Sequence, residues 1–241
     1  MRFETLPEAA AVAKRAAQLI SAEARAAVRL RGRFAFAVSG GHTPWQMLRL
    51  LAAEDVPWSQ VHLFQVDERV APDGDPDRNL THIRESLLAS VPLPAAQVHA
   101  MPIDAPDLAA AARDYERTLE GIAGTPPVLD LVHLGLGPDG HTASLVPGDA
   151  VLGVTDAGVA LTAPYLGRRR MTLTYPVLNR ARCVLWLATG SEKREMLARL
   201  RAADASIPAG RVEQRHAVVL TDRAAVEGST ATPPRREGER S

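Results

Sequence analysis

The amino-acid sequence predicts an α/β fold in which a mostly parallel sheet is flanked by helices on both faces. Short apolar runs alternate with amphipathic helical segments along most of the chain, and several of the runs end in glycine-rich or charged turns. Alternation of this kind is typical of βαβ units, which build parallel sheets. Since ligands bind beyond the carboxyl ends of the strands in such sheets, the turns that follow the apolar runs are the candidate sites.

The expected elements follow one another within residues 1–227. The first is a helix over residues 7–31, because apolar side chains such as Val12, Leu19 and Ile20 fall on one stripe. Later helices are expected at 43–53, around Ile83 and Leu87, at 108–119 and at 192–201. Strands are expected at 34–38, 61–66, 129–134, 171–175, 183–187 and 217–220.

The chain is expected to form one α/β domain over residues 1–227. Its length of 241 residues suits a single large domain, and neither a long linker nor an internal repeat divides it. Residues 228–241 are polar and aperiodic and include Pro233 and Pro234, so we expect them to form a disordered tail.

The charge balance and the cysteine content limit the possible partners. The sequence has 28 Lys and Arg against 28 Asp and Glu, so its formal net charge is zero and no global field draws it to nucleic acid or to an anionic membrane. The single cysteine, Cys183, lies in an apolar run and leaves no disulfide or cysteine-ligated zinc to consider. Neither a signal-peptide pattern nor a long apolar stretch is present. We therefore expect a cytoplasmic protein with a small-molecule ligand and no obligate protein partner.

The first candidate site is the turn after the strand at 34–38, with the sequence SGGHTP at residues 39–44. Gly40 and Gly41 let backbone N–H groups approach a ligand closely. Thr43 is the expected N-cap and Pro44 the expected first residue of the following helix. The positive end of a helix dipole attracts anions, so phosphate is the expected guest. On this motif alone, a plain tight turn is an equally good interpretation.

Three charged residues, Asp67, Glu68 and Arg69, follow the apolar run at 61–66. They fall at the ligand-binding edge of the sheet rather than on a helix face. If the strand continues, Asp67 and Glu68 point to opposite sides, so at most one faces a pocket directly and the other can orient Arg69. A solvated cluster of loop charges is the alternative interpretation.

The third candidate site is the sequence GLGPDGHT at residues 135–142. It matches the GxGxxG pattern of dinucleotide-binding folds, but it lies in the middle of the chain and has Pro138 within the turn, so we reject that interpretation. The chemical groups that remain are Asp139 and His141. A histidine takes a proton from water near neutral pH, and a carboxylate can fix its tautomer. A metal site is the less favoured use of this pair, because no further ligand accompanies it at metal-binding spacing.

Basic residues lie next to two of the later strands. Arg168, Arg169 and Arg170 stand directly before the expected strand at 171–175, and Lys193 follows the strand at 183–187. Arginine binds phosphate oxygens in a bidentate way, and a lysine near a helix start supplies a point charge. Three consecutive arginines are more often solvated surface, so this motif alone is weak.

Taken together and in this order, these segments resemble the 6-phosphogluconolactonase family, within the glucosamine-6-phosphate isomerase/6-phosphogluconolactonase superfamily. The resemblance runs from about Phe3 to Glu227. It depends on the sequences SGGHTP at 39–44, VDERV at 66–70, GLGPDGHTASL at 135–145, RMTLT at 170–174, TGSEK at 189–193 and DRAA at 222–225.

The resemblance implies a Rossmann-like fold, no metal and no organic cofactor. It implies hydrolysis of 6-phospho-D-glucono-1,5-lactone, the second step of the oxidative pentose phosphate pathway. By position, His141 is the implied general base, Asp139 its neighbour, and Asp67 a residue near the reacting carbon. The residues implied to bind the substrate and its phosphate are Gly40, Gly41, Thr43, Arg69, Arg170 and Lys193.

The chain departs from the family pattern at two places. Asp77-Arg78-Asn79 stands where Ser-Asn is frequent, which leaves open whether Arg78 adds a phosphate contact. Val146 stands where an aromatic residue is common, away from the implied chemistry.

Two other functions stay open. A glucosamine-6-phosphate deaminase or isomerase shares the expected fold, but such enzymes typically carry a tyrosine in place of Arg69 and Ile-Ala-Phe-Asn in place of residues 142–145. A non-catalytic sugar-phosphate sensor needs an output module, and no segment of the sequence is left over to form one.

Overall fold

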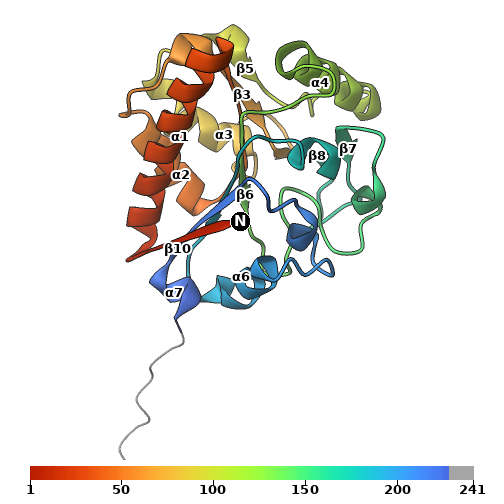
Figure 1. The fold of residues 1–241 in the computed structure, drawn as a ribbon. Coiled ribbons are helices and arrows are strands. Elements are labelled where there is room, and N and C mark those ends of the chain that lie inside the picture. Colours follow the sequence, from red (N-terminus) through yellow and green to blue (C-terminus); the bar gives the residue numbers. More distant parts are fainter. Residues whose placement is uncertain (228–241) are drawn as a thin grey trace, which may run out of the picture.

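The structure of the protein, a computed structural model, describes residues 1–227 and is built around a seven-stranded sheet (Figure 1). All neighbouring strands of this sheet are parallel, so the expected α/β class is confirmed. The tail expected at 228–241 lies outside the described residues. In spatial order the strands are β1 (Arg2–Leu6), β10 (Ala217–Asp222), β9 (Val184–Ala188), β6 (Leu131–Gly135), β2 (Phe34–Val38), β3 (Val61–Gln65) and β5 (Val98–His99).

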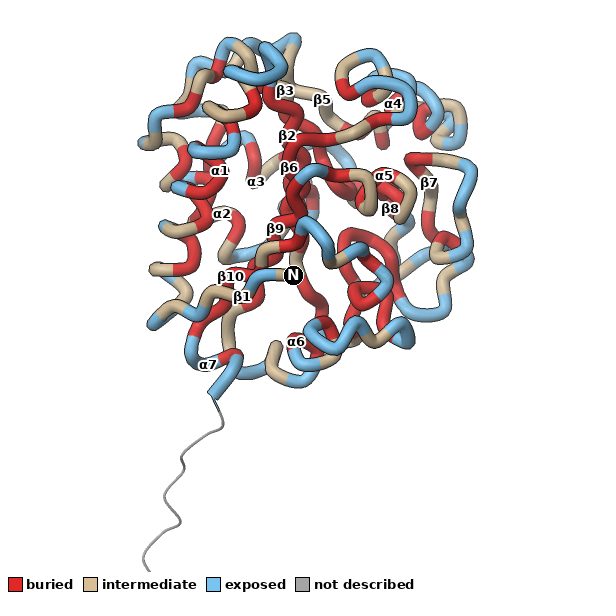
Figure 2. The backbone as a smooth tube through the Cα atoms, in the orientation of Figure 1, coloured by how far each residue is buried: buried red, intermediate tan, exposed pale blue. Residues whose placement is uncertain are grey.

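Helices cover both faces of this sheet. They are α1 (Ala9–Arg31), α2 (His42–Leu51), α3 (Asn79–Ser86), α4 (Leu108–Ala123), α5 (Tyr175–Leu178), α6 (Arg194–Arg201) and α7 (Arg223–Val226). Within β2, Phe34 and Phe36 join the core formed with α1 and α2, whereas Ala35 and Ala37 join the core formed with α4 and α6. Figure 2 shows the central strands buried between these layers. No helix in the described part of the chain is long and apolar enough to cross a membrane.

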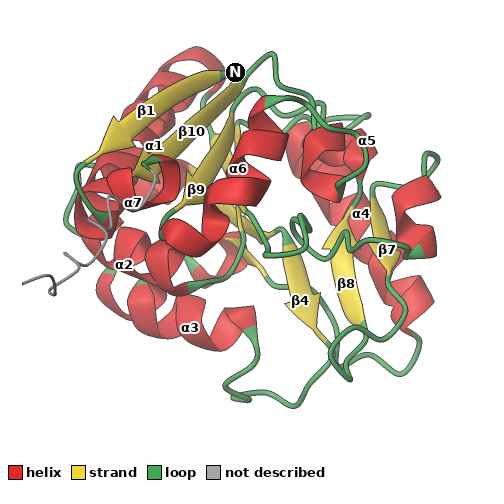
Figure 3. Cartoon of the chain, turned by 90° about the horizontal axis from the view of Figure 1, so that it is seen from below, coloured by secondary structure: helices red, strands yellow, loops and turns green. Residues whose placement is uncertain are grey.

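A smaller antiparallel sheet begins where β3 ends (Figure 3). It consists of β4 (Asp67–Arg69), β8 (Arg170–Leu173) and β7 (Val159–Leu161). The chain passes between the two sheets at Val66, whose N–H donates to the Val38 carbonyl and whose carbonyl accepts from the Leu173 N–H. Backbone pairing of β4 with β8 places Arg69 directly opposite Arg170.

The backbone corrects the expected start of the helix after β2. Helix α2 begins at His42 and its N-cap is Gly41, with a φ of 128°. Thr43 is therefore not the N-cap, and Pro44 is not the first helical residue. Because glycine adopts a φ that other residues rarely reach, the chain enters the helix two residues earlier than the capping pattern predicts.

Several strands also differ from the expectation, and the short strands β4, β5 and β7 were not predicted. The strand expected at 171–175 is β8, which runs antiparallel in the small sheet and ends at Leu173, while Tyr175 already begins α5. Strand β1 was not predicted, because only Phe3 and Leu6 of its five residues are apolar and they form no apolar run. Its position at the edge of the main sheet explains this pattern.

The order of the strands creates a switch point between β6 and β2. From β2 the chain adds β3 and β5 on one side, and from β6 it adds β9 and β10 on the other. Loops that leave the carboxyl ends on the two sides of such a point diverge and leave a crevice between them. The candidate turns follow β2, β3, β6 and β9, which are neighbours in the sheet, so the fold brings all of them to one place.

Two histidines in the strands make the stability of the fold sensitive to acid. Burial lowers the pKa of His133 in β6 to about 3, and burial together with the charge of His62 lowers the pKa of His99 in β5 to about 4. The folded protein keeps both rings neutral, whereas the unfolded chain takes up protons below the ordinary histidine pKa of about 6.5. This stability is complete above that pH and falls as the pH drops towards 4, by up to about 1.4 kcal/mol per pH unit for each histidine.

Chemical unfolding between about pH 7.5 and about pH 4.5 measures this loss. His99→Gln should flatten the dependence of the unfolding free energy on pH. Substitution of the exposed His216 by glutamine is the matched control and should leave the slope unchanged. An equally steep slope in H99Q and in the wild type would contradict the assignment of His99.

Candidate active site

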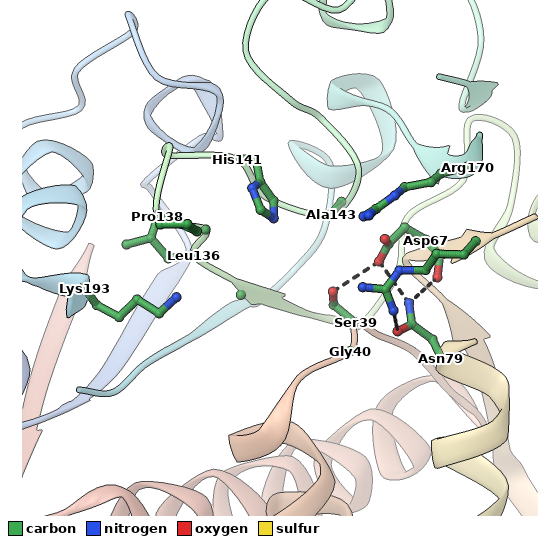
Figure 4. Close-up of a pocket in the computed structure, with 13 residues that line it drawn as sticks. Ser39, Gly40, Asp67, Asn79, Leu136, Pro138, His141, Ala143, Arg170 and Lys193 are labelled. Atoms are coloured by element: carbon green, nitrogen blue, oxygen red, sulfur yellow. Dashed lines mark hydrogen bonds between the residues drawn. The ribbon is translucent and has the colours of Figure 1, made fainter. Parts of the chain in front are cut away.

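The candidate turns enclose a cavity of about 190 Å³ at the carboxyl edge of the main sheet. Figure 4 shows Lys193 and Arg170 reaching into it from opposite sides, with His141 between them and Asp67 close to Arg170. The residues that line it are Ser39, Gly40, Asp67, Arg69, Asn79, Gly135, Leu136, Gly137, Pro138, His141, Ala143, Arg170 and Lys193.

Most of the site residues expected from the sequence meet here. Those that line the cavity are Gly40, Asp67, Arg69, His141, Arg170 and Lys193. Gly41 and Thr43 instead line an adjoining hollow of about 300 Å³, which shares Gly40 and Lys193 with the cavity. The Thr43 hydroxyl lies 2.8 Å from the Thr189 hydroxyl and so ties the first turn of α2 to the loop after β9.

His141 and Asp139 form a hydrogen-bonded pair within one loop. Asp139 Oδ1 lies 2.5 Å from His141 Nδ1 and also accepts the His141 backbone N–H at 3.1 Å. When Nδ1–H donates to the carboxylate, Nε2 carries the lone pair. Among residues 1–227, no hydrogen-bond partner occupies Nε2, and the ring reaches into the cavity (Figure 4). The pair can therefore accept a proton from a molecule bound there.

Neighbouring groups keep the Asp139 carboxyl ionised. Burial acts to raise the pKa of this carboxyl, but the hydrogen bonds and charge of His141 and the hydroxyl of Tyr165 outweigh burial, so the pKa is lowered overall. The group is therefore an ionised acceptor near neutral pH and maintains the tautomer of the histidine ring.

Glycines give this loop the room to seat the histidine. A Cβ on Gly137 would overlap the His141 ring, so only glycine fits beneath it. The Gly137 N–H donates to the His141 carbonyl at 2.8 Å. Gly137 thus makes room for the side chain of the candidate base.

Gly40 makes room in the same way for Asn79. A Cβ at residue 40 would overlap the Asn79 side-chain oxygen. That oxygen accepts from Arg69 Nη1 at 2.6 Å, and the Asn79 Nδ2 donates to the Asp67 carbonyl at 2.8 Å. The bare backbone at Gly40 thereby allows one amide to orient two residues of the cavity.

Asp67 is a buried carboxylate with several hydrogen-bond donors. Ser39 Oγ donates to Oδ1 at 3.2 Å, and Ser144 Oγ donates to Oδ2 at 2.7 Å. A third donor, Asn79 Nδ2, lies 3.4 Å from Oδ1. Since only 3% of the residue is exposed, these partners compensate for the loss of solvation and fix the carboxylate at the cavity wall.

Arg69 and Arg170 place two positive charges on one wall. As opposite residues of antiparallel strands, they project from the same face of the small sheet and repel each other. Burial and the charge of Arg69 lower the pKa of Arg170. Arg170 is 7% exposed, and within residues 1–227 its guanidinium has no hydrogen-bond or ion-pair partner. A bound anion would satisfy both groups, so the chemistry of this wall suits an anion.

Glu68 points away from the cavity, as the expected alternation of strand side chains requires. It is fully buried and accepts hydrogen bonds from the backbone N–H groups of Arg69 at 2.8 Å, Asn79 at 2.8 Å and Leu80 at 2.9 Å. The Gln65 side chain adds a fourth bond at 2.7 Å. Glu68 therefore joins β4 to the start of α3.

Arg78 lies behind Glu68 and is only 2% exposed. Its Nε is 3.8 Å from Glu68 Oε2, and its Nη1 is 3.2 Å from Asp104 Oδ2 and 3.5 Å from Asp73 Oδ1. The residues that line the cavity do not include Arg78. The buried Arg78 side chain thus forms ion pairs with the buried Glu68 and with the exposed Asp73 and Asp104, away from the cavity wall.

Three residues that shape the site were not singled out from the sequence, namely Asn79, Ser144 and Tyr165. A signal existed for Asn79, which is the first residue of a helix directly after the charged loop. Ser144 lies within a quoted segment, but its contact with Asp67 spans 77 residues. Tyr165 is outside every quoted segment, and its hydroxyl donates to Asp139 Oδ2 at 3.1 Å.

Outside the cavity, the cysteine and the paired histidines make contacts within the fold. Cys183 is the buried thiol that its apolar neighbours predict, and burial raises its pKa to about 12. His62 pairs with His99, with Nδ1 and Nε2 separated by 3.1 Å. Within residues 1–227, no group of three or more His, Cys, Asp or Glu side chains could hold a metal ion.

A family model described as glucosamine-6-phosphate isomerases/6-phosphogluconolactonase matches residues 7–221 of the chain. The chain belongs to this family. A curated 6-phosphogluconolactonase from Nostoc sp. is 37% identical over 206 residues, which are 84% of this chain and 85% of that protein. The family inferred from the sequence segments is thereby confirmed.

Solved structures give the same result at the level of the fold. The crystal structure of 6-phosphogluconolactonase from Thermotoga maritima matches with a TM-score of 0.82 and 28% identity, over 92% of this chain and 98% of that one. A monomeric glucosamine-6-phosphate deaminase matches with a TM-score of 0.81 over 93% of this chain and 98% of its own, but at 17% identity. The second likeness concerns the shared fold alone.

Removal of one of the two facing charges should abolish anion binding at little cost in stability. Arg170→Met keeps an apolar stem but relieves the repulsion with Arg69, so the Tm in phosphate-free buffer should stay unchanged or rise. Inorganic phosphate at about five times its Kd should stabilise the wild type by about 1 kcal/mol, and R170M should lose most of this gain.

Thermal unfolding with and without phosphate measures both effects. Arg169→Met is the matched control, because Arg169 is exposed, precedes Arg170 directly and does not line the cavity. R169M should keep the response of the wild type. A full phosphate response in R170M would show that the anion binds elsewhere.

Proposed function

We propose that the protein hydrolyses 6-phospho-D-glucono-1,5-lactone to 6-phosphogluconate, as a cytoplasmic enzyme without an obligate protein partner. Membership of the family and the curated relatives that carry the name 6-phosphogluconolactonase support this activity. The observation that carries it is the cavity in which the free Nε2 of His141 faces the same space as Arg69, Arg170 and Lys193. A general base and an anion-binding wall together suit a phosphorylated ester substrate.

In the proposed mechanism, His141 Nε2 takes a proton from a water molecule while the water oxygen attacks the lactone carbonyl. Asp139 stabilises the imidazolium that forms, since it accepts the hydrogen bond from Nδ1. The tetrahedral intermediate then collapses, the bond between the carbonyl carbon and the ring oxygen breaks, and the imidazolium returns its proton to that ring oxygen. The product is an open-chain acid, which ionises and releases one proton.

The basic residues and the glycine loop would hold the substrate during this reaction. Arg69, Arg170 and Lys193 neutralise the phosphate, and Gly40 and Gly41 line the same crevice at the start of α2, where backbone N–H groups can bind an anion. Such anchoring places the reacting carbon next to the histidine, so the phosphate contributes to rate as well as to affinity. Loop N–H groups are also the proposed donors to the oxyanion.

We assign Asp67 a role close to the reacting carbon. Its carboxylate lines the cavity, and its donors Ser39 and Ser144 leave it as an acceptor fixed in place. A hydroxyl of the sugar ring is the natural partner for such a group. Its charge also attracts the Arg170 guanidinium, which offsets part of the repulsion from Arg69.

Proton release from freshly generated 6-phosphogluconolactone, corrected for spontaneous hydrolysis, tests the activity. Ammonia release from glucosamine 6-phosphate is measured in parallel. Rapid acid release without ammonia supports the proposal. Ammonia release without lactone hydrolysis would move the chain to the deaminases, and inactivity in both assays would favour the sugar-phosphate sensor.

His141→Gln should lower kcat by ~10²–10⁴-fold, because general base catalysis by one side chain contributes about this much. The stabilisation by inorganic phosphate should be nearly unchanged, since the basic wall is intact. The exposed His216 provides the matched control, and H216Q should behave as the wild type in both measurements. Full turnover by H141Q would rule out the histidine as the base.

A further inference from the structure

A tight turn between β7 and β8 brings Tyr165 next to the histidine loop. The backbone N–H and carbonyl groups of Tyr165 and Arg168 pair with each other at 2.9 and 3.3 Å. The two residues between them, Leu166 and Gly167, have φ values of 52° and 78°. Positive φ at both positions is typical of the tightest hairpin turns, and it is strained for a leucine. The fold therefore maintains this turn against a local cost.

Ion pairs fasten the same turn to the loop that precedes α3. Arg168 Nη2 lies 3.1 Å from Asp75 Oδ2, and Arg168 Nε lies 3.0 Å from Asp77 Oδ2. The turn is thus anchored on both sides, by the small sheet and by this loop. Such anchoring restricts the positions that the Tyr165 side chain can take.

The Tyr165 side chain touches both functional parts of the cavity. Its hydroxyl donates to Asp139 Oδ2 at 3.1 Å, and its ring lies edge to face against His141, with 5.6 Å between the ring centroids. Its ring face also lies against Arg170, whose Cζ is 5.1 Å from the ring centroid. A single side chain therefore connects the proposed base to the anion site.

We propose that Tyr165 is a positioning residue of this active site, whose hydroxyl fixes the Asp139–His141 pair and whose ring aligns the Arg170 guanidinium for the substrate phosphate. This inference rests on the proposed lactone hydrolysis. It assigns Tyr165 no direct part in bond making or breaking.

The hydroxyl completes the coordination of the Asp139 carboxylate. Oδ1 accepts both donors of His141, which leaves Oδ2 to Tyr165. With a donor on each oxygen, the carboxylate cannot rotate without the loss of a hydrogen bond to a charged group. Burial and the contact with Asp139 raise the pKa of Tyr165 above its usual value, so the phenol stays protonated and donates across the neutral range.

The Tyr165 ring aligns Arg170 without occupying the N–H donors of the guanidinium. A cation over an aromatic face is attracted to the ring itself, so the contact leaves the guanidinium N–H groups free to bind an anion. A carboxylate partner in the same position would compete with the phosphate for those N–H groups. The tyrosine ring thus explains how a buried arginine can be held in place and still lack a hydrogen-bond partner within the described residues.

Steady-state kinetics of Tyr165→Phe test the role of the hydroxyl. We expect kcat to fall about 10-fold, the value of one hydrogen bond to a charged group, with KM within about 2-fold of the wild type. Without the hydroxyl, more of the Asp139 charge acts on the histidine ring, so the acidic limb of kcat/KM against pH should move to higher pH. Tyr175→Phe is the matched control, because it also removes a hydroxyl bond, to the Pro208 carbonyl, outside the cavity.

Tyr165→Leu separates the ring from the hydroxyl. This variant should show the kcat defect of Y165F and, in addition, a weaker Tm response to inorganic phosphate, equivalent to a roughly 3- to 10-fold higher Kd. Y165F retains the ring and should keep the phosphate response. Equal phosphate responses in Y165L and in the wild type would overturn the role of the ring.

Spectrophotometric titration of tyrosinate tests the contact without any substrate. Burial raises the pKa of Tyr175 to about 12 and that of Tyr115 further still, so Tyr165 should ionise first among the three tyrosines. Asp139→Asn removes the negative charge that disfavours the phenolate, so this first transition should move to lower pH. The first transition should be missing in Y165F, and its loss would assign that transition to Tyr165.

The outcomes separate the two proposals. A wild-type protein that does not hydrolyse the lactone would overturn the proposed function. An active wild type, with Y165F indistinguishable from Y175F in kcat and in the acidic limb, would overturn only the role of Tyr165. An unchanged tyrosinate transition in D139N would likewise contradict it.

Discussion

Where the chain leaves the parallel sheet for the antiparallel one, the buried carboxylate of Glu68 accepts four hydrogen bonds. Two come from the first N–H groups of α3 and one from Arg69, so a single group caps a helix and fixes the strand beside it. Asp67 and Arg69 flank Glu68 and point the opposite way, into the cavity. Their positions therefore depend on a contact made on the far side of the strand. Loss of this carboxylate would leave several buried donors without a partner, which is costly.

The cavity concentrates positive charge that the fold neutralises only in part, through the carboxylate of Asp67. Arg69 and Arg170 face each other across two strands, and Lys193 reaches in from the other side (Figure 4). Groups held in this way need no rearrangement when an anion arrives, so the binding free energy is not consumed by ordering side chains. The stability of the surrounding α/β core allows the protein to maintain such an arrangement.

The sequence predicted the parallel sheet and the edge at which the candidate turns meet, because both depend on local patterns. Apolar runs that are followed by Gly40 or by Asp67 identify strands and their ligand-binding edges. This identification does not require knowledge of which strands pair with each other. The small sheet was not predicted, since β4 has three residues and exists only through its pairing with β8. The contacts of Ser144 and Tyr165 depend in the same way on distant parts of the chain. The start of α2 was misplaced because a glycine φ overrides the capping preference of Thr43.

The close approach at Gly40 has a consequence for how this protein can change over time. The space that a side chain at residue 40 would fill is already taken by Asn79, which orients both Arg69 and Asp67. A mutation at residue 40 therefore has its main effect through residues that are remote in sequence. A larger side chain at residue 40 can be accepted only together with a smaller side chain at residue 79. That second change removes the hydrogen bonds by which Asn79 holds Arg69 and Asp67. The two positions form an epistatic pair, and neither has a neutral route to substitution while the cavity keeps its present geometry.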